Sequence, residues 1–153
     1  MKISYKKTKS IIQKIVLLLS VVLLSACSVN NSTLPENYID NNGMVISELV
    51  EVSREKIIIN YINTSENRFT FGERFILQSF KKGSWKKVRT SLGVFYNDLM
   101  YVVLAGEETP NHIAYNLEIN HGKLKDGHYR IIQDMEISGE SKYIQAITEF
   151  VLP

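Results

Sequence analysis

The ten residues Leu124–Gln133, LKDGHYRIIQ, place an acid, an imidazole, a phenol and a guanidinium within five consecutive positions. In an extended strand, successive side chains point to opposite faces of the sheet. His128 and Arg130 are therefore expected on one face and Tyr129 on the other, so these groups cannot converge on one substrate. The stretch predicts a strand that starts after an Asp126-Gly127 turn, and not a catalytic cluster.

Short apolar segments separated by turn signals extend outward from this stretch over most of the chain. The last two, Tyr129–Ile137 and Tyr143–Leu152, alternate apolar and polar residues as strands with one buried face do, except that Ile132 and Gln133 fall on the wrong sides. Further strands are expected at Gly43–Val52, Lys56–Asn63, Phe69–Phe71, Arg74–Phe80, Trp85–Val88, Leu99–Leu104 and His112–Ile119. No segment shows a convincing helical pattern. The chain is therefore predicted to be all-β, an antiparallel sandwich of about seven to eight strands.

Three residues of the opening stretch have the spacing of a structural corner. In immunoglobulin-type sandwiches, a Tyr near the start of the penultimate strand follows a tight turn and hydrogen-bonds back to the preceding backbone. Leu124 is expected to be buried, Gly127 to supply the permissive turn backbone, and Tyr129 to close the corner. We interpret Leu124, Gly127 and Tyr129 as structural residues.

Two longer segments resemble a known family. IIINYINTSENRFTFGERFILQSFKKGSWKKV (Ile57–Val88) and HGKLKDGHYRIIQDM (His121–Met135) are similar to a bacterial immunoglobulin-like domain family found on lipoproteins of Gram-positive bacteria. The shared features are the Asn-rich turn after the first strand, Phe71-Gly72-Glu73, the Gly83–Trp85 step and the Gly-x-Tyr-Arg-Ile core. The resemblance implies an immunoglobulin-like sandwich without a common catalytic role. Thr90–Tyr101 departs from it, because such domains often have a more polar loop there.

The N-terminus has the pattern of an export signal. Five lysines precede the apolar run Ile15–Leu24, which is followed by Ser25, Ala26 and Cys27. The run is too short to span a bilayer, which takes about 20 residues, but it fits the apolar region of a signal peptide. These residues resemble a bacterial lipoprotein signal, and the resemblance implies cleavage between Ala26 and Cys27 and a diacylglyceryl anchor, with palmitate, on Cys27. The alternative is an ordinary signal peptide followed by an unrelated Cys.

This signal defines the expected organisation and location of the protein. Residues 1–26 are the predicted signal peptide, 27–42 a lipidated flexible tether rich in Asn and Ser, and 43–153 the sandwich domain. Two acyl chains suffice for stable anchoring, so we expect the domain on the extracytoplasmic side of the cell membrane. Five of the 18 Lys and Arg residues belong to the leader, which leaves 13 against 16 Asp and Glu. That balance does not favour a nucleic-acid partner.

The sequence predicts neither an enzyme nor a cofactor or metal site. The histidines His112, His121 and His128 lack the His-x-His or His-x₃-His spacing that brings two imidazoles to one face. The only Cys is assigned to the lipid, and the chain has neither a Gly-rich phosphate loop nor a Gly-x-Ser-x-Gly elbow.

One run of charge stands out between two predicted strands. Lys81, Lys82, Lys86, Lys87 and Arg89 surround a hairpin loop predicted at Lys81–Ser84. They form a candidate contact patch for anionic lipid headgroups or teichoic polymers. The alternative is a solvated hairpin whose lysines protect an edge strand from aggregation. Trp85, within this run, is expected in core or corner packing.

We therefore predict a non-enzymatic, membrane-anchored surface lipoprotein whose domain binds an envelope protein or anionic polymer, or serves as a structural module. The alternative is an inhibitor or sensor accessory that inserts a loop such as Leu104–His112 into an envelope enzyme. An exposed apolar loop tip would favour the inhibitor. A continuous basic face would favour contact with a polymer or a membrane.

Overall fold

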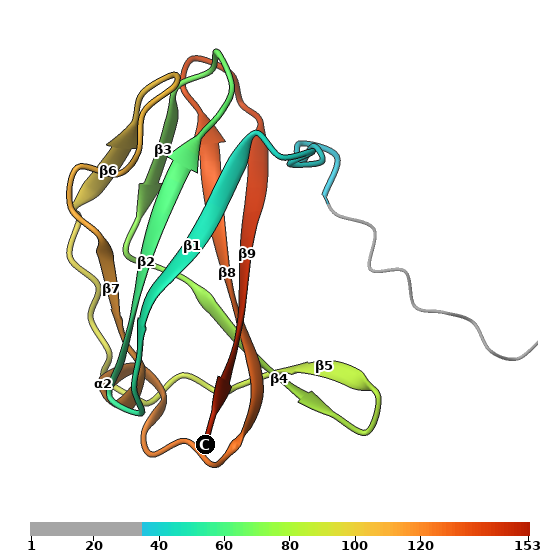
Figure 1. Ribbon diagram of the computed structural model, residues 1–153, viewed down its shortest axis with the longest axis vertical. Helices are drawn as coiled ribbons and strands as arrows, with labels where there is room; N and C mark the ends of the chain where they lie inside the picture. The colour runs from blue at the N-terminus through green and yellow to red at the C-terminus, as the bar shows by residue number, and fades with distance from the viewer. Residues whose placement is uncertain (1–34) are drawn as a thin grey trace, which may run out of the picture. The chain divides into compact units, whose positions relative to one another are not determined.

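The computed structural model describes residues 35–153, which form two antiparallel sheets packed face to face (Figure 1). The smaller sheet has the order β1-β2-β7, with β1 at Val45–Val52, β2 at Lys56–Asn63 and β7 at Ile113–Asn116. The larger sheet has the order β5 (Ser84–Lys87), β4 (Ile76–Lys81), β8 (Gly127–Ile137), β3 (Phe69–Gly72) and β6 (Met100–Val103), and β9 (Tyr143–Leu152) also pairs with β8. The predicted all-β sandwich is confirmed, with nine strands in the described residues.

Strand β8 organises the larger sheet because it pairs along both edges. Its residues Gly127–Glu136 pair with β9, its first half pairs with β4 and its last residues pair with β3. Tyr129, Ile131 and Met135 point into the core, as the alternation predicts. Gln133, on the same side, is 1% exposed. The apparent irregularity of this strand is thus a polar side chain held inside the sandwich.

Strand β2 is central in the smaller sheet, as its apolar sequence predicts. Ile57, Ile59 and Tyr61 are fully buried against the larger sheet. Ile58 and Ile62, on the other face, are only partly covered. Burial on both faces, which the continuous apolar run predicts, is therefore partial.

A short helix replaces the end of one predicted strand. The expected strand His112–Ile119 ends at Asn116, and α2 occupies Leu117–His121. The amides of Leu117 and Glu118 both donate to the carbonyl oxygen of Glu55, at 2.8 and 3.2 Å, and this shared acceptor turns the chain out of the sheet. The prediction of a chain without helix is wrong at this point. Among residues 35–153, no helix is long and apolar enough to span a membrane.

The domain makes ordered contacts earlier than the predicted boundary at residue 43. The amide of Tyr143 donates to the carbonyl oxygen of Asn37, and the amide of Ile39 donates to the carbonyl oxygen of Tyr143, both at 2.9 Å. The ring of Tyr38 stacks on that of Tyr143 at 5.5 Å. Residues 37–39, expected in the tether, are therefore bound to the start of β9. The signal peptide, Ala26, Cys27 and the first part of the tether lie outside the described residues.

Candidate functional site at the β4–β5 hairpin

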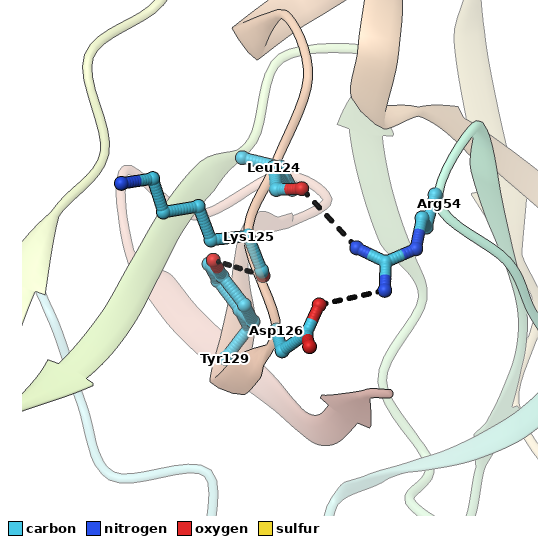
Figure 2. Close-up of polar contacts among 5 residues, drawn as sticks. All are labelled: Arg54, Leu124, Lys125, Asp126 and Tyr129. Carbon is cyan, nitrogen blue, oxygen red and sulfur yellow. Dashed lines mark hydrogen bonds and ion pairs between the residues drawn. The ribbon is translucent and has the colours of Figure 1, made fainter.

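The start of β8 has the geometry of a tyrosine corner. The hydroxyl of Tyr129 donates to the carbonyl oxygen of Lys125 at 2.8 Å, as Figure 2 shows. Leu124 is 7% exposed, and its carbonyl oxygen accepts a hydrogen bond from Arg54 at 3.3 Å. Gly127 has a φ of 153°, and a Cβ there would lie 3.5 Å from the Tyr129 ring. These contacts fix the path of the chain into β8.

The polar groups of this stretch do not share a centre. Asp126 pairs with Arg54 at 2.6 Å, and His128 Nε2 lies 3.0 Å from a carboxylate oxygen of Glu149. Arg130 Nε donates to Gln78 Oε1 at 2.7 Å on the outer face of the larger sheet. Tyr129 points the opposite way, into the core. His128 and Arg130 thus lie on the outer face, while Tyr129 lies in the core and Asp126 pairs with Arg54, so the four groups do not converge on one centre.

Tyr129→Phe is expected to lower the free energy of unfolding by about 1 kcal/mol, because it removes one net hydrogen bond while leaving the ring in place. Urea unfolding followed by tryptophan fluorescence measures the change. Tyr143→Phe is the matched control, because the Tyr143 ring packs on Tyr38 while no hydrogen bond from its hydroxyl is present among residues 35–153. Equal midpoints for Tyr129→Phe and the wild type would contradict a stabilising corner.

The hairpin between β4 and β5 turns through two residues with left-handed backbones. Phe80 pairs with Trp85 and Lys81 with Ser84, so Lys82 and Gly83 form the loop. Their φ values are 50° and 77°, as a type I′ turn requires. The predicted loop is confirmed, and the hairpin projects from the body of the sandwich (Figure 1).

Trp85 lies on the outer face of the larger sheet and is half-buried, so its predicted place in core or corner packing is wrong. Its ring makes edge contacts with Phe80 at 5.2 Å and with His128 at 5.0 Å. The Arg130 guanidinium lies 4.4 Å from the ring centroid, which is a cation–π distance. The sequence alternation indicated the outward face of His128 and Arg130, but not that they meet Trp85, because that depends on the pairing of β4 with β8.

The five basic residues of the candidate patch surround this projecting hairpin. Lys81, Lys82, Lys86, Lys87 and Arg89 are all exposed. None takes part in the four ion pairs found within residues 35–153. Lys87 shares a face with Gln78, whereas Lys86 shares the opposite face with Ser79. The charge therefore encircles the hairpin and does not form one flat face.

The loop expected to insert into an enzyme is bound along β2. The amide of Asn63 donates to the carbonyl oxygen of Glu107 at 2.8 Å, and that of Thr109 donates to Tyr61 at 2.9 Å. The Asn60 amide also donates to the Glu108 carboxylate at 2.7 Å. The segment Leu104–His112 is therefore held to the sheet. Among residues 35–153, the most exposed large apolar side chains lie before this loop, at Leu92 (89%) and Phe95 (94%).

The three histidines lie in separate environments. His112 is exposed, and His128 pairs with Glu149. His121 Nδ1 lies 3.1 Å from the carbonyl oxygen of Arg89, and burial lowers the pKa of its imidazole. No group of three or more His, Cys, Asp or Glu residues that could hold a metal ion is found in the described part of the chain.

Comparison with known proteins identifies one family. The model of a bacterial Ig-like domain family matches residues 44–148. Among solved structures, the archaellum periplasmic stator protein FlaG from Sulfolobus acidocaldarius is 12% identical, with a TM-score of 0.38 over 68% of this chain and 97% of that chain. A crystal structure of a protein from Archaeoglobus fulgidus is 16% identical, with a TM-score of 0.28 over 71% and 95% of the two chains. No curated protein matches the chain.

Proposed function

The chain belongs to the bacterial Ig-like domain family, and from this premise we propose that it is a non-enzymatic lipoprotein that contacts an anionic partner on the outer side of the cell membrane. The anchor would be a diacylglyceryl group on Cys27. The contact surface would be the β4–β5 hairpin. Neither role requires a catalytic centre or a cofactor.

The observation that supports binding is the uncompensated charge of the hairpin. Ammonium and guanidinium groups that project into solvent without carboxylate partners are free to bind anionic groups of another molecule. Protection of an edge strand accounts for lysines on β5 itself. It does not account for Lys82, which lies in the loop, or for Arg89, which follows the end of the strand. Binding explains these two residues as well.

The lipid anchor is tested by metabolic labelling of cells that express the full chain with palmitate. Label is expected on the wild type and absent from Cys27→Ala, because the chain has no other cysteine and acylation requires the thiol. The wild type is also expected in the membrane fraction and the variant outside it. Equal labelling of both proteins, or a wild type without label, would reject the anchor.

A second candidate function is favoured by the exposure of Leu92 and Phe95. Both side chains are almost fully exposed and so are available to pack against another protein. This supports the inhibitor or sensor accessory, with segment 88–99 as the inserted element in place of Leu104–His112. Crosslinking in intact cells separates the candidates. Loss of the captured partner in Leu92→Ser/Phe95→Ser supports protein docking, and loss in Lys82→Glu/Lys86→Glu supports the hairpin.

A further inference from the structure

Further exposed cations lie in the segment that leads into β8, where Glu55 and Glu118 line the same hollow as Lys123. Lys123 and Lys125 are exposed and belong to the segment that leads into β8. Neither takes part in an ion pair of the described residues. Figure 2 shows the Lys125 ammonium group pointing away from the pair formed by Arg54 and Asp126, so that pair does not neutralise it.

Two contacts connect the segment of these lysines to the strands that carry the hairpin. His121, next to their segment, lies 3.1 Å from the carbonyl oxygen of Arg89. Tyr129, four residues after Lys125 in the chain, pairs with Ser79 of β4. We call the seven exposed cations of this region the basic end: Lys81, Lys82, Lys86, Lys87, Arg89, Lys123 and Lys125.

The N-terminal segment joins the domain at the opposite end of β8. Residues 37–39 bind Tyr143, which pairs with Glu136 near the end of β8, whereas the basic end adjoins Gly127 at its start. Strands rise about 3.4 Å per residue, so the two ends of this span lie about 31 Å apart. Figure 1 shows the same arrangement, with the start of the described chain near the first residues of β9 and the hairpin towards its last.

The proposed anchor favours one orientation of the domain on the bilayer. Cys27 and Asn37 are ten residues apart, so the chain between them can span at most about 36 Å. When β8 stands perpendicular to the membrane, the end of the domain that contains Tyr143 lies next to the bilayer and the basic end points away from it. Inverting the domain to bring the basic end to the same bilayer would use almost the whole length of this segment.

We propose that the basic end binds a linear polyanion outside the membrane, such as a chain of phosphodiesters, and not the headgroups of the bilayer that holds the anchor. This rests on the proposed function, because the orientation depends on lipidation of Cys27. Repeated charges on one flexible polymer reach several of the seven cations together, and each further contact adds to the overall affinity. Such binding weakens steeply with salt, because every neutralised anionic group releases a counterion.

The test uses the full lipidated chain in vesicles of zwitterionic lipid and a fluorescent inorganic polyphosphate as the probe. The wild type is expected to bind the probe, with affinity that falls by about tenfold or more from low to physiological salt. Lys82→Glu/Lys86→Glu and Lys123→Glu/Lys125→Glu should each weaken binding by about tenfold. Arg68→Glu/Lys142→Glu makes the same change in net charge at the other end of the domain and should alter affinity by less than about twofold.

A second arm distinguishes the polymer from the bilayer. The same protein is placed in vesicles containing anionic lipid, and acylation of its lysines by a water-soluble reagent is measured by mass spectrometry. The proposal expects Lys82 and Lys123 to react equally in both kinds of vesicle and to be protected only by polyphosphate. Protection by anionic lipid, or absence of polyphosphate binding, would overturn it. Neither result would affect the palmitate labelling, so failure of this proposal is distinguishable from failure of the anchor.

Discussion

Replacing Asn63 with alanine is expected to lower the free energy of unfolding by about 3 kcal/mol. The side chain is 1% exposed at the end of β2. Its Nδ2 donates to the carbonyl oxygens of Asn67 at 2.6 Å and Leu104 at 2.9 Å, and its Oδ1 accepts from the amide and the hydroxyl of Ser65. Each net hydrogen bond is worth about 1 kcal/mol, and groups left buried without a partner add to the loss.

This side chain matters because it adds a direct contact between the end of β2 and the end of β6, next to the backbone bonds that hold residues 107–109 to β2. β2 belongs to the smaller sheet, whereas Leu104 follows directly on β6 of the larger sheet. One amide therefore closes the 63–67 turn and also ties the two sheets together. Alanine leaves the backbone unchanged but removes all of these contacts together.

Urea unfolding measures the effect, and Asn67→Ala provides the matched control. Asn67 lies in the same turn, yet the only side-chain contact of its amide among the described residues is with the Met44 sulfur at 4.0 Å. It should cost less than about 0.5 kcal/mol. If Asn63→Ala lost as little free energy of unfolding as Asn67→Ala is expected to lose, or if both variants lost the same amount, the Asn63 side chain would not join the sheets.

The sequence predicted those parts of the fold that depend on local pattern. Alternation identified β8 and β9, and the stretch Lys81–Ser84 identified the hairpin loop, because strand period and turn backbone are properties of neighbouring residues. The five basic residues of the candidate site were found for the same reason, since they lie within nine positions of one another. The role of Asn63 was not predicted, because Leu104 is 41 residues away in sequence.

The other differences between the predicted and the observed structure also come from contacts between residues that are distant in sequence. Trp85 lies on the outer face because it pairs with Phe80 of β4, and the pairing of β4 with β8 brings Arg130 to its ring. Helix α2 has only five residues, too few for a 3.6-residue periodicity to be detected. Residues 37–39 were predicted to belong to a flexible tether. Their binding site at Tyr143 is more than 100 residues away in the sequence and is defined only by the fold. Lys123 and Lys125 join the basic end in the same way, through the fold and not through the charge run.

Tyr115→Phe is expected to lower the free energy of unfolding by about 2 kcal/mol. The Tyr115 hydroxyl donates to Gln133 Oε1 at 2.9 Å and lies 2.8 Å from the Tyr61 hydroxyl. Because the Tyr115 hydroxyl donates its one proton to Gln133, the Tyr61 hydroxyl must donate to the oxygen of Tyr115. All three side chains are 2% exposed or less. Phenylalanine therefore leaves both Gln133 Oε1 and the Tyr61 hydroxyl without their partner in the core, and each unsatisfied buried group costs about 1–3 kcal/mol.

A double-mutant cycle with Gln133→Met separates the hydrogen bond from the loss of packing. Gln133→Met alone leaves the Tyr115 hydroxyl without its acceptor and should also cost about 2 kcal/mol. The double variant removes donor and acceptor together, so its loss should fall short of the sum of the single losses by at least about 0.5 kcal/mol. Strict additivity in urea unfolding would show that the two groups do not interact.

The same network makes the domain sensitive to alkali. Burial raises the pKa of Tyr115 well above its ordinary value, and burial also raises the pKa of Tyr61. Unfolded tyrosines lose their protons near pH 10, whereas these two keep theirs in the folded state. The unfolded state then binds fewer protons, so the stabilising contribution of these two groups is complete below about pH 10 and declines as the pH rises above it.

The Tyr115→Phe variant lacks one of the two groups. Its urea midpoint should therefore decline less steeply between pH 9 and 11 than that of the wild type. An unchanged slope would mean that Tyr115 ionises as freely in the folded protein as in the unfolded chain, which would contradict its place in the network.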